Sequence, residues 1–296
     1  MTTKWWLGCS IVVGSLALVG CGDDGGDGGS GGAGGGGTGG TAGSGGGSGS
    51  GGTAGTGGAA GSSGSGGSAG NSGSGGTGGA AGGELLALVR GTLFTTDMVA
   101  AQAKHDALAS GGEAAAKSQG DVAHDVGLGT TLLGTTENAF LGIDRWTAGS
   151  NPAAFYGNAD FQAAFATLFS GAPTLEIFQA PSGWHTWGNL DAADSADPHY
   201  FVVVRGKLAK DAAGTQPNHD ALAAQGEPQA KAAGDVAHVV YLGAQDPKEF
   251  LAIDLWTKSD AMAQVYGDPD FQKAFGALFE SAPSLAVYQS TKFHQW

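Results

Sequence analysis

The feature that most constrains the fold of this chain is an internal repeat in its C-terminal part. Residues 105–128 and 219–242 are identical at 16 of 24 aligned positions. Shorter matches extend the alignment on both sides: 89–91 with 204–206, 140–147 with 250–257, and 156–162 with 266–272. Two copies of one unit, each of roughly 95 residues, must therefore fold alike and bury their apolar surface in equivalent ways.

The sequence before the repeat has a composition that does not form a core. Residues 22–83 contain 35 Gly in 62 positions, and the others are almost all Ser, Thr and Ala. Such a segment buries too little apolar surface to offset the entropy lost on ordering, so we expect a disordered tether. Collagen is excluded because there is no strict three-residue period and no proline.

The first 20 residues are typical of an export signal. Lys4 precedes an apolar run from 5 to 19, and this run is too short for a membrane-spanning anchor, the alternative interpretation. The run ends in Leu18-Val19-Gly20-Cys21, which resembles a bacterial lipobox and implies a lipid on Cys21. Because Gly22 follows the Cys, we expect anchoring at the outer membrane, with the lipid bilayer as a partner.

Charge and cysteine content exclude several classes of function. From residue 84 onward 12 basic and 24 acidic residues give a net charge of 12 − 24 = −12, so nucleic acid is not an expected partner. The two Cys, Cys9 and Cys21, both precede the repeat. We therefore expect no disulfide, no thiol nucleophile and no thiolate metal site in the folded part.

Each repeat is predicted to run strand, helix, strand, strand, helix, strand. In the second copy, strands are expected at 200–208, 236–242, 249–257 and 285–289. Helical stretches are expected at 212–233, broken at Pro228, and at 259–281. This βαββαβ order is the ferredoxin-like pattern, in which one sheet face stays bare, and two tandem copies can cover each other's bare face.

The repeats resemble the dimeric α/β-barrel superfamily, and within it the antibiotic biosynthesis monooxygenase-like group. The resemblance is clearest in 254–256, 261–263 and 268–271. It implies an α+β fold in which two tandem ferredoxin-like repeats form a single-chain pseudo-dimer. The predicted divisions are a signal peptide (1–20), the lipidated Cys with its tether (21–83), repeat one (84–187), a linker (188–198) and repeat two (199–296).

Strand alternation assigns candidate ligand-binding residues to faces. In the third strand of repeat two, we expect Leu251, Ile253 and Leu255 to pack on the helices and the alternate face to look into the barrel. That inward set contains Asp254 and Trp256, and repeat one has Asp144 and Trp146 at the same positions. Arg90 and Arg205 are expected to point inward and to pair with these Asp residues, either as a structural brace or as a polar anchor for a ligand.

The two Trp residues, Trp146 and Trp256, bear on whether the protein binds haem. In haem-degrading members of the group, a Trp at this strand-three position crowds the ligand, and a His nine positions later contacts the iron. The equivalent positions here are Phe155 and Val265, which are apolar, so we expect no haem and no other cofactor. Trp146 and Trp256 are then core residues or a pocket wall.

The histidines are the candidate catalytic residues. Two His recur 19 residues apart in each copy, and Asp residues near them suggest a His-Asp general base or a two-His, carboxylate metal site. The spacing of these His and Asp residues matches no known metal motif in either copy, so we expect no metal. A purely structural role for the histidines stays open. The candidates are His105, His124, His219 and His238, with Asp106, Asp121, Asp220 and Asp235.

A further repeated motif follows the last strand of each copy. Residues 184–187 read Trp-His-Thr-Trp and residues 293–296 read Phe-His-Gln-Trp. Aromatic side chains in a polar tail tend to be buried, and we expect them at the barrel rim, with a protein contact as the alternative.

The resemblance implies cofactor-independent oxidation of a small aromatic or quinol-type substrate. In that case the Trp pair lines the cavity, His124 and His238 act as bases, and Arg90 and Arg205 steady an oxyanion. The alternatives are a non-enzymatic module that binds a small apolar or aromatic ligand, and a surface interaction domain with a filled interior.

Overall fold

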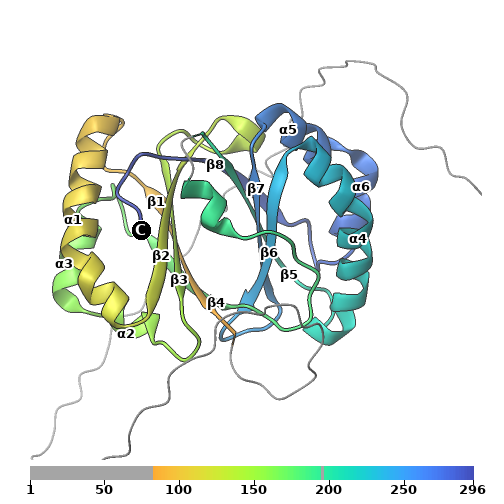
Figure 1. Cartoon of the computed structure of the whole chain (residues 1–296), viewed down its shortest axis with the longest axis horizontal. Coiled ribbons are helices and arrows are strands. Elements are labelled where there is room, and N and C mark those ends of the chain that lie inside the picture. The colour runs from red at the N-terminus through yellow and green to blue at the C-terminus, as the bar shows by residue number, and fades with distance from the viewer. Residues whose placement is uncertain (1–82, 195–196) are drawn as a thin grey trace, which may run out of the picture. The chain divides into compact units, whose positions relative to one another are not determined.

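The computed structural model describes residues 83–194 and 197–296, which belong to one compact unit (Figure 1). The predictions on the signal peptide, Cys21 and the tether lie outside these residues. No helix in the described part of the chain is long and apolar enough to cross a membrane.

The first repeat contributes four strands and three α-helices. They are β1 (Leu85–Thr92), α1 (Met98–Ser118), β2 (Asp121–Gly129), β3 (Ala139–Trp146), α2 (Pro152–Tyr156), α3 (Ala159–Ala166) and β4 (Thr174–Gln179), with the 3-10 turn η1 (Leu132–Gly134) between β2 and β3. A second 3-10 turn, η2 (Leu190–Asp194), lies in the segment expected to be a linker.

The second repeat has the same order. Its elements are β5 (Tyr200–Lys207), α4 (Ala212–Ala233), β6 (Asp235–Gly243), β7 (Glu249–Trp256), α5 (Ser259–Gly267), α6 (Pro269–Gly276) and β8 (Ser284–Ser290). The expected helical stretch 259–281 is two helices, because Asp268 ends α5 and its side chain caps the amides of Asp270 and Phe271 at the start of α6.

The expected break at Pro228 is wrong: α4 continues through both Pro217 and Pro228. A proline inside a helix leaves the carbonyl four residues earlier without its amide partner. Pro228 and Ala224 are both exposed, so water is available to that carbonyl.

The eight strands form a closed antiparallel barrel. Its order is β1-β3-β2-β8-β5-β7-β6-β4, so each repeat supplies four adjacent strands. The two sets meet where β2 pairs with β8 and where β4 pairs with β6. Figure 1 shows α1, α2 and α3 on one side of the strands and α4, α5 and α6 on the other. The fold is thus a mixed α+β barrel.

The faces predicted for the third strand of each repeat are reversed, whereas Arg205 shares the inward face of its strand with Phe201 and Val203, as expected. Leu251, Ile253 and Leu255 belong to a buried cluster that combines strand residues from both repeats, including Leu86 and Phe201, which is the barrel interior. Phe250 and Trp256 pack instead with helix residues such as Met262. Alternation groups side chains correctly but does not say which group faces inward. Here the large aliphatic set fills the barrel, as an eight-stranded barrel requires.

A glycine in β5 makes a close packing contact that repeats in β1. A Cβ on Gly206 would lie 2.6 Å from Cδ1 of the buried Phe279, and one on Gly91 would lie 2.5 Å from Cδ1 of Phe169. Only a hydrogen at these positions lets each ring lie flat on its strand.

We expect Gly206→Ala to lower the free energy of unfolding by about 1–3 kcal/mol, because the added methyl overpacks this contact. Gly226→Ala is the matched control: Gly226 lies inside α4 with nothing within 4 Å of its Cβ position. It should raise stability by about 0.5–1 kcal/mol through helix propensity. Urea unfolding followed by circular dichroism measures both, and equal effects of the two changes would contradict the packing argument.

Candidate functional site

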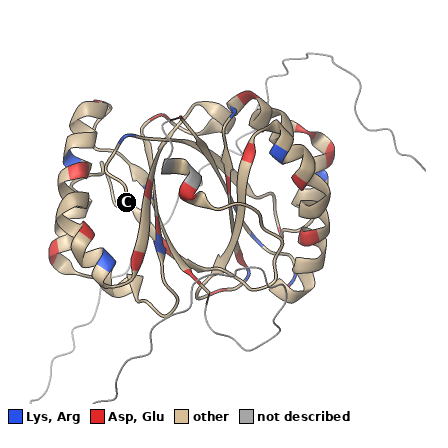
Figure 2. Cartoon of the chain, in the orientation of Figure 1, with Lys and Arg blue, Asp and Glu red and all other residues tan. Residues whose placement is uncertain are grey.

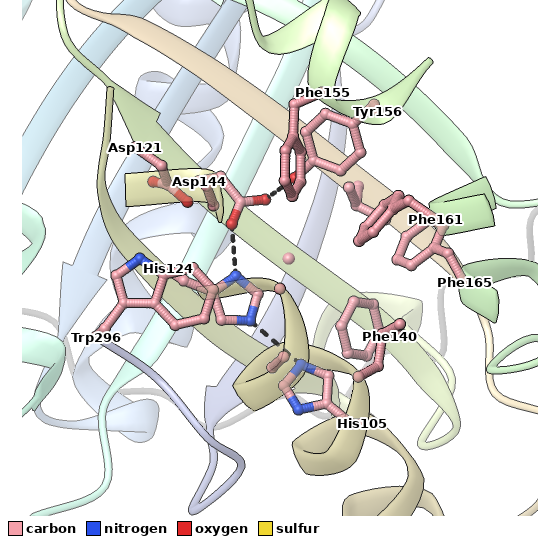
Figure 3. A pocket seen from close by; sticks show the side chains of 16 residues that line it. His105, Asp121, His124, Phe140, Asp144, Phe155, Tyr156, Phe161, Phe165 and Trp296 are labelled. Carbon is pink, nitrogen blue, oxygen red and sulfur yellow. Dashed lines mark hydrogen bonds and ion pairs between the residues drawn. The ribbon is translucent and has the colours of Figure 1, made fainter. Parts of the chain in front are cut away.

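A cavity lies between α1 and the outer face of the sheet in repeat one, and not in the barrel interior where a ligand space was expected. Its volume is about 40 Å³, room for roughly three water molecules. The polar lining groups are His105, Asp121, His124, Asp144 and Tyr156. Aromatic side chains complete the walls (Figure 3): Phe140, Phe155, Phe161, Phe165 and Trp296.

The polar groups form one hydrogen-bonded chain. Nδ1 of His105 bonds Asp106 at 3.1 Å, and the two Nε2 atoms of His105 and His124 lie 3.2 Å apart. Nδ1 of His124 bonds Oδ1 of Asp144 at 2.5 Å, and the hydroxyl of Tyr156 donates to Oδ2 of Asp144 (Figure 3). The chain therefore runs from the half-exposed Asp106 to the buried Tyr156.

Repeat two contains the same chain. His219 bonds Asp220 at 3.0 Å, and its Nε2 lies 3.3 Å from Nε2 of His238. His238 bonds Asp254 at 2.5 Å, and Tyr266 donates to Asp254 at 2.5 Å. The structure thus brings together, within each repeat, both predicted histidines and the predicted strand-three Asp.

Counting protons fixes the charge of each histidine pair when the carboxylates are ionised. A carboxylate only accepts, so Nδ1 of His105 and Nδ1 of His124 both carry a proton. One more proton must lie between the two Nε2 atoms, since two bare nitrogens would repel. The two rings therefore hold three protons and one positive charge, balanced by Asp144 beside them.

The pKa values of the pair are displaced in opposite directions. Burial lowers the pKa of His105 to about 4, and the neighbouring His124 acts in the same sense. Burial also opposes the charged form of His124, but the charge and hydrogen bond of Asp144 outweigh it and raise the pKa of His124. The shared proton accordingly resides on His124.

A second carboxyl lies in the same cavity with a different environment. Burial, followed by the negative charge of Asp144, raises the pKa of Asp121 to about 8. The same two causes, burial and Asp254, raise the pKa of Asp235 to about 9. Such displaced values are common at functional sites.

Each site is closed by the tail of the other repeat. Trp296, from the end of repeat two, stacks on His124 of repeat one with ring centres 4.5 Å apart. The amide of His294 donates to Asp106 at 2.6 Å, and its ring bonds Glu113 at 2.9 Å.

The tail of repeat one does the same for repeat two. Trp187 stacks on His238 at 4.5 Å, and the amide of His185 donates to Asp220 at 2.8 Å. The expected barrel-rim position of these tail aromatics is therefore wrong, because they cover the helix side of the opposite repeat.

The predicted Arg–Asp pairing is also wrong. Arg90 and Arg205 both bond the carboxylate of Glu176 on β4, and Arg90 does so at 2.8 Å. Val89 lines the cavity and Arg90 follows it, so alternation turns Arg90 to the barrel side of the sheet. Neither Arg is placed to hold a ligand in this cavity.

The Trp pair lies in the helix-side core and not inside the barrel. Trp146 packs 5.5 Å from Phe155 and 6.4 Å from Tyr156, ring centre to ring centre. Trp256 packs 6.3 Å from Tyr266. Trp146 thus lies behind residues that line the cavity, without being one of them.

Sequence reasoning missed the two tyrosines, whereas Asp121 and Asp235 were among the candidate carboxylates. The signal for Tyr156 and Tyr266 was present, since both belong to a segment that recurs in the repeat. Among residues 83–194 and 197–296, no group of three or more His, Cys, Asp or Glu side chains is arranged to hold a metal ion.

Comparison with known proteins identifies the fold class. No protein-family model matches the chain, and no curated protein does. A crystal structure of a candidate monooxygenase from Fusobacterium nucleatum is similar, with a TM-score of 0.52 and 8% identity over 72% of this chain and 94% of that one. The closed eight-stranded α+β barrel of this protein is therefore a fold that it shares with that structure.

Two other solved structures resemble the chain more weakly. A candidate monooxygenase from Lactobacillus acidophilus has a TM-score of 0.46 and 9% identity over 72% of this chain and 95% of that one. An anthrone oxidase-like protein has a TM-score of 0.48 and 19% identity, with coverage of 72% and 92%.

We expect the crossing of each tail onto the opposite repeat to be visible in amide hydrogen exchange. Trp296→Ala should speed amide exchange in β2 about tenfold, because the stacking that holds the bond from the His124 amide to the Trp296 carbonyl is lost. Exchange in β6 should not change. Trp187→Ala should do the reverse, and mass spectrometry of the two strand peptides measures both. If each variant instead sped amide exchange in the repeat from which its Trp comes, the crossing of the tails would be contradicted.

Proposed function

We propose that this protein is an oxygenase that needs no cofactor and oxidises a small aromatic diol in the cavity under α1. The observation that carries the proposal is the buried chain from Asp106 to Tyr156, which runs beside a cavity walled by aromatic rings. The rings suit a flat aromatic ligand, and the chain provides groups that hold and move protons.

The reaction needs only the ligand and oxygen. Loss of a hydroxyl proton makes the ring electron-rich, and a ring carbon then adds O₂ to give a hydroperoxide. Loss of water from the hydroperoxide leaves a carbonyl. For 1,4-dihydroxynaphthalene the balance is C₁₀H₈O₂ + O₂ → C₁₀H₆O₃ + H₂O, so one oxygen atom enters the product and the other leaves as water.

The size of the cavity requires movement for such a ligand to enter. About 40 Å³ does not hold a two-ring diol. Trp296 is the wall contributed by a tail and not by the barrel, so its displacement is the simplest way to enlarge the space.

We also propose, for the fold, that the two halves are tandem ferredoxin-like repeats that form a single-chain pseudo-dimer. The strand order β4-β1-β3-β2 in one half and β8-β5-β7-β6 in the other supports it, as does the 16-in-24 identity.

The second candidate function is a binding module without turnover. It is favoured by the engagement of both ring nitrogens of His124 within the protein, which leaves neither free for a ligand. Ligand affinity without oxygen consumption would select it.

Oxygen uptake by the purified protein tests the first candidate. With 1,4-dihydroxynaphthalene, hydroquinone and catechol we expect uptake above the buffer rate, and ¹⁸O₂ should place one labelled atom in the product. The double variant His124→Asn/His238→Asn should lose turnover about 100-fold or more, because the proton chain is broken. An oxygen electrode and mass spectrometry give the readouts, and buffer-level uptake for every compound would refute the proposal.

Gly142→Ala tests the cavity separately from the proton chain. Its added methyl would lie 3.2 Å from Cε1 of Phe140 on the cavity wall, and repeat two already has Ala252 at this position. One methyl in a pocket is worth about tenfold or more in discrimination, so KM in repeat one should rise while the proton chain stays intact.

The lipid anchor completes the proposal. Cys21 at the end of an apolar run supports lipidation, and the glycine-rich segment supports a tether to the outer membrane. We expect the chain expressed in a bacterial host to partition into detergent and Cys21→Ser to partition into the aqueous phase. Equal partitioning of both forms would remove the anchor from the proposal.

A further inference from the structure

A β-bulge turns Asp121 toward the cavity. Along β2, Asp121 pairs with Trp146 but Ala123 pairs with Arg145, so Val122 is an extra residue in the strand. The bulge puts Asp121 on the same face as His124, which regular alternation over three positions would not do. The same register shift occurs between Asp235 and Ala237 in β6.

Asp121 and Asp144 lie in one buried site but differ in their partners. Asp144 accepts bonds from His124 and Tyr156, both of which stabilise its ionised form. The contact described for Asp121 is a 3.3 Å bond from the amide of Ala123. Of these two neighbouring carboxyls, Asp121 is therefore the one with few hydrogen-bond donors and a raised pKa.

The charged and titratable groups that act on Asp121 come from every element around it. They are Asp144 from β3, His124 from β2, Lys117 from α1 and Tyr156 from α2. Burial and Asp144 favour the protonated carboxyl and outweigh His124 and Lys117, which gives the raised pKa of about 8. A group of this kind is largely protonated at neutral pH and is a strong base once ionised.

His124 is less suited to receive a ligand proton directly. Both of its ring nitrogens are hydrogen-bonded within the protein, and the Trp296 ring covers its face. Asp121 lines the same cavity, as Figure 3 shows, on the Asp144 side of the aromatic walls.

We propose that Asp121, and not His124, is the catalytic residue that takes the hydroxyl proton from a ligand in this cavity. The proton moves from the ligand oxygen to the Asp121 carboxylate and then to the outer oxygen of the peroxide that O₂ addition forms. When the O–O bond breaks, that OH leaves as water together with the hydrogen of the ring carbon, and the ring carbon becomes the carbonyl. The chain from Tyr156 to Asp106 fixes the Asp144 carboxylate by hydrogen bonds beside Asp121 and is a positioning system. This inference rests on the proposed function, and Asp235 occupies the equivalent place in repeat two.

The first test needs no ligand. Protonation of Asp121 and Asp235 favours the folded state, because their pKa values are higher there than in the unfolded chain. Their contribution to stability is full below about pH 4 and is lost as pH rises through about 8 to 9. Relative to Asp121→Asn/Asp235→Asn, the unmodified protein should therefore lose urea resistance between pH 5 and pH 9. Parallel curves for the two proteins would overturn the inference.

The second test uses turnover of 1,4-dihydroxynaphthalene by the whole protein. Turnover by the unmodified protein should rise about tenfold per pH unit and level off near pH 8 to 9. In the double variant Asp121→Asn/Asp235→Asn turnover should fall about 100-fold, while binding of the diol should still quench the tryptophan fluorescence. Asp125→Asn is the matched control. Asp125 is a buried carboxyl on the same strand as Asp121, and it is adjacent to His124, whose side chain faces the cavity. This control variant should retain the pH profile.

The two proposals fail in different ways. Turnover that survives in the double Asn variant overturns the role of Asp121 and leaves the oxygenase intact. No turnover in the unmodified protein sinks the oxygenase and this inference together.

Discussion

The structure depends on keeping one face of each four-stranded sheet away from water. Leu86, Leu88, Phe201, Leu251 and Ile253 are all fully or almost fully buried in the interior that the two sheets share. Neither repeat covers this surface alone, because its helices lie on the other face. Closing the sheets edge to edge through β2–β8 and β4–β6 satisfies both the side chains and the backbone groups of the edge strands.

That closure determines where chemistry can occur. The barrel interior is packed with large apolar side chains, and the cavity lined by the histidines and Asp144 lies between sheet and helices. It also carries the end of each repeat across to the other one, so that Trp296 covers His124 and Trp187 covers His238. Each site is consequently built from both repeats, although its proton-carrying groups come from one.

The order of elements and the pairing of like residues could be predicted from the sequence, and the orientation of the faces could not. Local periodicity predicted the strands and helices of repeat two, apart from the continuous path through Pro228 and the division at Asp268. The histidines were identified because they recur in both copies. Their partners were misassigned, since the Asp254 face was expected to meet Arg205 inside the barrel.

The sequence by itself determined that two like halves exist, that the same pair of histidines and a strand-three aspartate recur in each, and that the segment before them has a different character. These properties follow from identity and periodicity, which are local. Only the tertiary structure decided which sheet face turns inward, that each tail crosses to the other repeat, and that Asp121 joins the His124 face. Alternation is unchanged when the two faces are exchanged, and contacts such as that of Asp106 with His294 join residues far apart in the chain. The choice therefore depends on the packing of all eight strands at once.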